Sequence, residues 1–149
     1  MDLMFGATVF EHGQKAGRLA GVEIDPASRR ALKIIFSANG HLGPGAFTRP
    51  IEAVAVEGDR VTIVGEPPPS PPLPFRLEPL LWSPGTHVVR GREEIARLTG
   101  VRVEQGSGKL ALAFERRSLW SRRLELPLDK VDLSVLGEVR LGAPRSTAA

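Results

Sequence analysis

Hydrophobic and polar positions alternate along most of this chain in short runs that turn residues separate. Residues 17–24 carry apolar side chains at Leu19, Val22 and Ile24, and residues 31–36 form a second apolar run after a turn. Short periodic runs bounded by Gly, Pro, Asp and Ser are typical of β-strands. The pattern therefore predicts a strand, a turn and a returning strand, with those three side chains facing the core.

The same pattern occurs in the second half of the chain. Residues 98–103 and residues 110–114 form two apolar runs on either side of a glycine-rich turn, and they predict a second strand pair. Only residues 51–53 and 92–97 carry a pattern that predicts a short helical turn. The chain as a whole is therefore predicted to be mainly β.

A tight hairpin is predicted in the first half. Residues 54–56 and 61–64 are apolar runs on either side of Gly58 and Asp59, a pair that suits a hairpin tip. Several short strands at this close spacing are typical of small antiparallel barrels or sandwiches.

The two halves align with each other. Residues 6–24 match residues 85–103 without a gap, and the dipeptide Gly21-Val22 meets Gly100-Val101. With one residue dropped in the next turn, the apolar matches continue as Leu32 with Leu110, Ile34 with Leu112 and Phe36 with Phe114. Because every apolar match keeps its phase, both halves are predicted to bury the same sheet face, as expected for an internal repeat.

A proline-rich segment, EPPPSPPLP, separates the halves. Proline fixes φ and donates no backbone hydrogen bond, so this segment is predicted to lie outside any sheet, as a semi-rigid linker. The predicted organisation is a first domain at 1–65, a linker at 66–78, a second domain at 79–142 and a flexible tail at 143–149. Trp82 is predicted to pack where the two halves meet.

Composition narrows the class of protein. The chain has 149 residues, of which 42% are hydrophobic, and it has no cysteine. Disulfides, thiolate metal sites and cysteine nucleophiles are excluded, and a cytoplasmic location is the expectation. No apolar run approaches the roughly 20 residues that span a bilayer, so no membrane span is expected.

Positive charge is concentrated in the second half. Residues 1–66 carry 7 Lys and Arg against 8 Asp and Glu, a net charge of −1, whereas residues 67–149 carry 13 against 9, a net charge of +4. Arginine supplies 16 of the 20 cations. This composition suits bidentate recognition of carboxylate or phosphate groups, although a codon bias toward arginine gives the same count.

The first half contains the run GQKAGRLAGVEIDPASRRALKIIF, followed by a polar loop and RPIEAV. With its glycine-bearing turn, apolar strand ending in Asp, second apolar strand and proline step, this run resembles the PRC-barrel family. The matching positions are Gly13, Gly17, Val22, Ile24, Asp25, Ile34, Phe36, Pro50 and Val54. The second half follows the same outline but has Ala96 in place of Gly17 and Glu104 in place of Asp25.

This resemblance implies two small antiparallel β-barrels in tandem, joined by the proline-rich linker. It also implies a module that contributes protein contacts rather than catalysis, and it brings no catalytic residues. The histidines are consistent with a module that lacks catalysis, since the spacing of His12, His41 and His87 is not that of metal ligands. No enzyme activity, cofactor or metal is expected.

The segment ERRSLWSRR, residues 115–123, is unlike the rest of the chain because four arginines flank a tryptophan. Binding residues concentrate in such loops, and arginine with tryptophan fits an acidic protein face or stacked bases. The competing interpretation is a solvated hairpin with its arginines paired internally. The candidate partner-binding residues are Arg116, Arg117, Trp120, Arg122 and Arg123. The expected partner is an unidentified protein, with RNA or the ribosome as the alternative, and the oligomeric state is left open.

Overall fold

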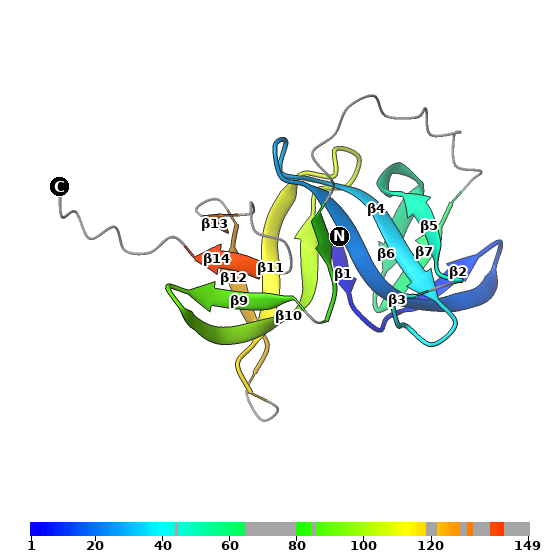
Figure 1. Cartoon of the computed structure of the whole chain (residues 1–149). Coiled ribbons are helices and arrows are strands. Elements are labelled where there is room, and N and C mark those ends of the chain that lie inside the picture. Colours follow the sequence, from blue (N-terminus) through cyan, green and yellow to red (C-terminus); the bar gives the residue numbers. More distant parts are fainter. Residues whose placement is uncertain are drawn as a thin grey trace.

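A computed structural model describes residues 1–43, 45–64, 80–84, 86–118, 122–128, 131–132 and 138–141 of the chain (Figure 1). The proline-rich linker predicted at 66–78, the tail at 143–149 and Trp120 lie outside the described residues. The described part is mainly β and its one helical element is a single 3-10 turn, η1 (Ile51–Ala53), as the sequence pattern predicts for those residues.

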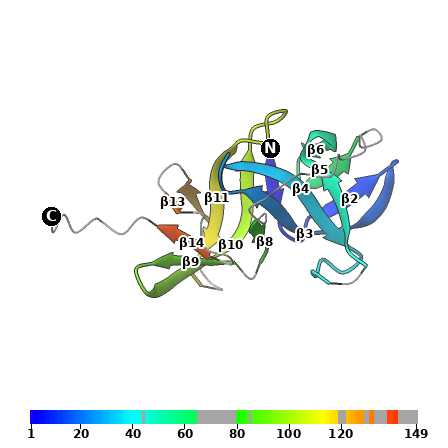
Figure 2. The same cartoon turned by 45° about the horizontal axis from the view of Figure 1, so that its top comes forward.

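Two sheets form the molecule, and they lie beside each other (Figures 1 and 2). The first has the strand order β5 (Phe47–Pro50), β4 (Arg30–Ser37), β3 (Gln14–Asp25), β2 (Thr8–Glu11), β7 (Arg60–Ile63) and β6 (Val54–Glu57). The second has the order β12 (Leu124–Pro127), β11 (Leu110–Arg116), β10 (Glu93–Val103), β9 (His87–Arg90), β14 (Glu138–Leu141) and β13 (Val131–Asp132). Corresponding strands therefore follow the same order in both sheets.

Each sheet is completed by one short strand from the other half of the chain. Strand β1 (Asp2–Met4) pairs with β10 of the second sheet, and β8 (Leu80–Trp82) pairs with β3 of the first. The registers correspond as well, since Leu3 is opposite Val101 and Trp82 is opposite Val22. The two halves thus exchange their first strands reciprocally. No pattern in the sequence predicts this exchange.

Glycine permits this exchange. A Cβ atom at Gly21 would lie 2.8 Å from the carbonyl oxygen of Trp82, and one at Gly100 would lie 2.6 Å from that of Leu3. Both distances are shorter than side-chain carbons tolerate, so only glycine lets each exchanged strand approach this closely. The matched Gly-Val dipeptides of the two halves mark the two points of exchange.

The buried residues form one hydrophobic cluster that draws on both halves. Leu19, Val22 and Ile24 are fully buried, as predicted, and Trp82 is fully buried where β8 meets the first sheet. The prediction that Trp82 packs where the halves meet is confirmed.

One expectation about the sheets needs correction. Strand β2 runs parallel to β7, and β9 runs parallel to β14, so neither sheet is wholly antiparallel. No strand pairing in the described ranges closes either sheet into a barrel, so the tandem barrels stay a prediction. In each half the chain passes through several strands before it returns to the first hairpin of that half. The returning strand, β7 or β14, then runs in the same direction as its partner, β2 or β9.

The helical turn predicted at 92–97 is wrong, because residues 93–97 belong to β10 and Arg92 lies in the turn before it. Strand β10 is paired on one side with β9 and on the other with β11. These pairings satisfy the backbone on both sides and override the local helical preference.

The one-residue gap in the sequence alignment is also wrong. Val22 is opposite Ile34 in the first sheet and Val101 is opposite Ala113 in the second. Along the same strands, Leu19 is opposite Phe36, whereas Leu98 is opposite Glu115. The gapped alignment matches Phe36 with Phe114. In the structure, the residue that corresponds to Phe36 is Glu115, a carboxylate.

Candidate functional site

The arginine-rich segment lies at the connection between β11 and β12. Arg116 is the last residue of β11 and is opposite Arg97 of β10, so two cations stand on neighbouring strands. Arg117, Arg122 and Arg123 are exposed, as is Arg116. Residues 117–118 and 122–123 therefore lie between two adjacent antiparallel strands, as the sequence predicts.

Arg97, Arg116 and Arg117 line one cavity, which we call the arginine groove. Its volume is about 540 Å³, and its wall includes half-buried Ile95 and Ser118 of the arginine-rich segment. Arg97 is partly neutralised, since its Nε lies 3.3 Å from Oε1 of Glu94. The groove thus combines an apolar strand surface with cations from three positions.

Glu115 is a buried anion beside this surface, in addition to Glu94, which lines the groove itself. Its side chain is 4% exposed, and its Oε1 lies 3.5 Å from a terminal nitrogen of Arg117, whose side chain is 52% exposed. The other oxygen, Oε2, is buried without a hydrogen-bond partner among the described residues. Arg117 is therefore held by an internal carboxylate that is itself only partly satisfied.

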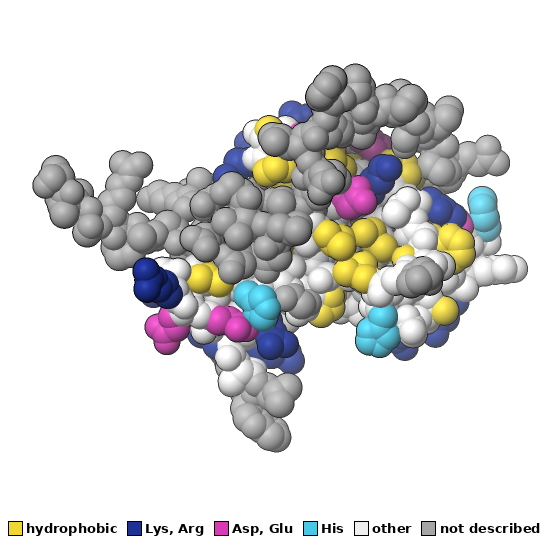
Figure 3. All heavy atoms as spheres, in the orientation of Figure 1, with side chains coloured by type: hydrophobic (Ala, Val, Ile, Leu, Met, Phe, Trp, Pro, Cys, Tyr) yellow, Lys and Arg dark blue, Asp and Glu magenta, His cyan; other side chains and the backbone are white. Residues whose placement is uncertain are grey.

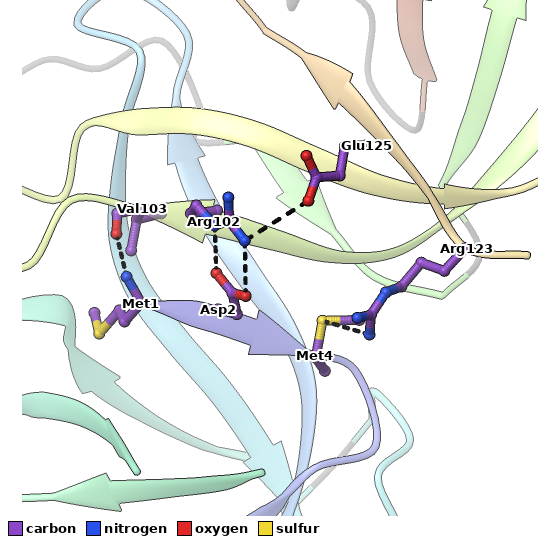
Figure 4. Close-up of polar contacts among 7 residues, drawn as sticks. All are labelled: Met1, Asp2, Met4, Arg102, Val103, Arg123 and Glu125. Atoms are coloured by element: carbon purple, nitrogen blue, oxygen red, sulfur yellow. Dashed lines mark hydrogen bonds and ion pairs between the residues drawn. The ribbon is translucent and has the colours of Figure 1, made fainter. Parts of the chain in front are cut away.

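Arg123 does not join the arginine groove. Its guanidinium lies 4.7 Å from the centre of the Phe114 ring, and its Nη1 is 3.6 Å from Sδ of Met4 (Figure 4). Arg102 lies over the same ring at 5.4 Å. The structure thus separates the predicted cations, since Arg123 reaches the exchanged strand β1 while Arg116 and Arg117 line the groove.

An ion pair connects β1 to the second sheet beside Arg123. Arg102 donates to both oxygens of Asp2, from Nε at 2.6 Å and from Nη2 at 3.1 Å, and it lies 3.8 Å from Glu125 (Figure 4). The hydrogen bond from Arg102 holds the pKa of the Asp2 carboxyl below its ordinary value of 3.8. Two main-chain contacts between Met1 and Val103, at 2.7 and 3.0 Å, extend the same junction.

Hydrophobic side chains are exposed on the first half. Leu42 is 39% exposed and Phe47 and Val64 are each 52% exposed. Figure 3 shows apolar atoms gathered on the face of the first sheet, with charged side chains around them. Phe47 stacks on Phe36 with ring centres 5.6 Å apart. The first half therefore presents an apolar surface, in contrast to the arginine groove of the second.

The histidines lie apart from one another in the fold. His12 is in the turn between β2 and β3, His41 is in the loop after β4, and His87 is in β9 with Nδ1 2.7 Å from Glu94 Oε1. Within the described ranges, no group of three or more His, Asp or Glu side chains is placed to hold a metal ion.

Comparison with known proteins adds no family. No protein-family model matches the chain, and no curated protein matches its sequence. Among the residues that the structure describes, no helix is long and apolar enough to cross a membrane.

Sequence reasoning did not identify four residues that contribute to these surfaces. Arg97 was matched with Arg18 as part of the repeat, and nothing in the local pattern placed it beside Arg116. Glu115 was read as one end of the charged segment, and only the strand register shows that it points into the interior. Asp2 and Arg102 are brought together by the exchange of β1.

Proposed function

We propose that this protein is a non-enzymatic interaction module, built from two PRC-barrel-like domains in tandem, that engages a protein partner through the arginine groove. The common strand order of the two sheets and the paired glycines at the points of exchange support the tandem repeat. A cytoplasmic location, expected for a cysteine-free sequence, belongs to the same proposal.

One observation carries the proposal. Arg97, Arg116 and Arg117 line a single cavity of about 540 Å³ that also has an apolar wall. Arginine is enriched at the centres of protein interfaces because its stem packs on apolar surface while its guanidinium binds carboxylates. The groove therefore fits an acidic segment of a partner that also carries an apolar side chain.

Affinity capture followed by mass spectrometry tests the proposal. We expect the intact protein to retain a partner that the double variant Arg116→Ala/Arg117→Ala loses. The control is Arg90→Ala, which removes an exposed arginine at the end of β9, outside the groove. Equal recovery of every partner by the wild type and the double variant would contradict the proposal.

The alternative function is binding to RNA or the ribosome by the basic second half. It is favoured by the excess of positive charge in residues 67–149 and by the cation pair Arg97 and Arg116. Because phosphate contacts release counterions, such binding weakens steeply as the salt concentration rises. RNA binding that is absent at low salt, or unchanged up to physiological salt, would remove this alternative.

A further inference from the structure

A second cavity lies where the two halves meet, away from the arginine groove. Its volume is about 440 Å³, within the range of about 300–1,000 Å³ that is common for small-molecule sites. Strands β1, β2 and β3 and the turn between β6 and β7 provide most of its wall, and Arg123 enters from the second half. We call it the junction cavity.

Two guanidinium groups line the junction cavity, those of Arg18 and Arg123. Arg18 donates from Nη1 to the carbonyl oxygen of Gly6 at 3.1 Å. Arg123 contacts the sulfur of Met4 and the ring of Phe114 (Figure 4). Within the described ranges neither guanidinium has a carboxylate at ion-pair distance, although each carries five donors.

Two carboxylates also line the cavity, and their situations differ. Both oxygens of Asp2 accept hydrogen bonds from Arg102, so its charge is already compensated. Asp59, at the turn between β6 and β7, lines the cavity without an ion pair among the described residues. The cavity thus offers two guanidinium groups and the carboxylate of Asp59, which has no ion pair among the described residues. The hydroxyl of Thr8 also lines it.

We infer that the junction cavity binds a small organic anion that also carries a hydroxyl or amine group. A carboxylate or phosphate group suits the guanidinium groups of Arg18 and Arg123, because their planar donors match its paired oxygens. The hydroxyl or amine group of the ligand donates to Asp59, which disfavours an anion without such a donor. This site uses Arg123, which the arginine groove does not, and it stands independently of the proposed partner binding.

Titration of the isotope-labelled protein with small anions, followed by its amide chemical shifts, tests the inference. The probes are L-malate and glycerol 3-phosphate, one for each kind of anionic group, and succinate, which resembles malate but lacks its hydroxyl. We expect saturable shifts at Gly6, Thr8 and Gly58 with malate or glycerol 3-phosphate, and weaker binding of succinate. Arg18→Gln and Arg123→Gln should each weaken binding by about tenfold, the usual effect of losing a charge-assisted hydrogen bond.

The matched control is Arg122→Gln, which removes the neighbouring arginine that does not line the cavity. We expect Arg122→Gln to bind malate and glycerol 3-phosphate as the wild type does. The thermal midpoint of each variant shows whether that variant is folded. If neither malate nor glycerol 3-phosphate gives saturable shifts with the wild type, the inference is wrong. If Arg122→Gln weakens binding as much as Arg123→Gln does, binding reflects general surface charge, and the inference is equally overturned.

Discussion

At the residue scale, the most unusual feature is the buried carboxylate of Glu115. The corresponding residue of the first sheet is Phe36, which is 1% exposed, and Glu115 is 3% exposed. One carboxylate oxygen faces Arg117 at 3.5 Å and the other has no hydrogen-bond partner among the described residues. A buried carboxylate with one distant cation is costly, because desolvation exceeds the attraction of a half-exposed partner. Glu115 therefore holds Arg117 at the groove at some cost to stability.

This balance gives a prediction for single substitutions. Glu115→Leu should leave the free energy of unfolding unchanged or raise it, since an apolar side chain suits this position. Arg117→Ala should lower it by about 1 kcal/mol, because the buried carboxylate loses its one cation. Urea denaturation followed by circular dichroism measures both changes.

Arg116→Ala is the control, because Arg116 is exposed and has no ion pair among the described residues, so its removal should change stability by less than about 0.5 kcal/mol. A large loss of stability in Glu115→Leu would show that the carboxylate stabilises the fold.

At the scale of elements, the exchanged strands hold the two halves together. Strand β1 pairs with β10 and β8 pairs with β3, so each sheet depends on three residues from the other half. A second link joins the sheets where Ala31 donates to the carbonyl oxygen of Gly108 at 2.8 Å and Leu110 donates to that of Arg29 at 3.0 Å. The two halves are consequently connected by backbone hydrogen bonds as well as by the shared core.

Gly100→Ala tests the exchange at β1. The added Cβ would meet the carbonyl oxygen of Leu3 at 2.6 Å and the sulfur of Met4 at 2.7 Å. Since the backbone of β1 must move to accommodate it, we expect a loss of about 1–3 kcal/mol in the free energy of unfolding. Amide hydrogen exchange should show lost protection in residues 2–4 of β1 before β10 loses its protection.

Glu93→Ala, at the exposed start of the same strand, is the matched control and should leave that protection intact. Wild-type protection of residues 2–4 in Gly100→Ala would contradict the close approach of β1 to β10.

At the scale of the whole molecule, charge reinforces the junction between the halves. Asp2 and Arg102 lie about 100 residues apart in the chain, and their paired hydrogen bonds span the junction. Within the first half, Arg49 likewise donates to both oxygens of Glu11, at 2.7 and 3.0 Å, and that hydrogen bonding lowers the pKa of the Glu11 carboxyl. Both carboxylates thus favour the folded state in their ionised form.

The pH dependence of stability follows from these lowered pKa values. The Asp2 carboxyl has a lower pKa in the folded than in the unfolded chain, so its stabilising effect is present above its ordinary pKa of 3.8 and is lost as the pH falls through the folded value. Because the Asp2 side chain is 38% exposed, solvent screening limits the effect to about 0–1 kcal/mol.

Asp2→Asn should therefore lower stability near neutral pH and reduce its acid-side slope, as measured by urea denaturation across pH. Glu57→Gln, at the exposed end of β6, serves as the control. An unchanged acid-side slope in Asp2→Asn would count against the ion pair.

The amino-acid sequence by itself determined the local elements and much of the core. The alternation around Leu19, Val22 and Ile24 predicts a strand with these residues buried, and the Gly58-Asp59 tip predicts the hairpin of β6 and β7. These features are local, since side-chain period and turn chemistry act over a few residues. The arginine-rich connection was predictable for the same reason.

Only the tertiary structure decided which strands pair and where the charged residues meet. A three-residue strand such as β1 has no pattern that favours one sheet over the other, and the glycine that permits its close approach, Gly100, lies 96 residues beyond Met4. The same pairing places Asp2 beside Arg102 and brings Arg123 to the junction cavity, away from Arg116. Strand partners and register depend on the packing of the entire core, so periodicity along one segment does not specify them.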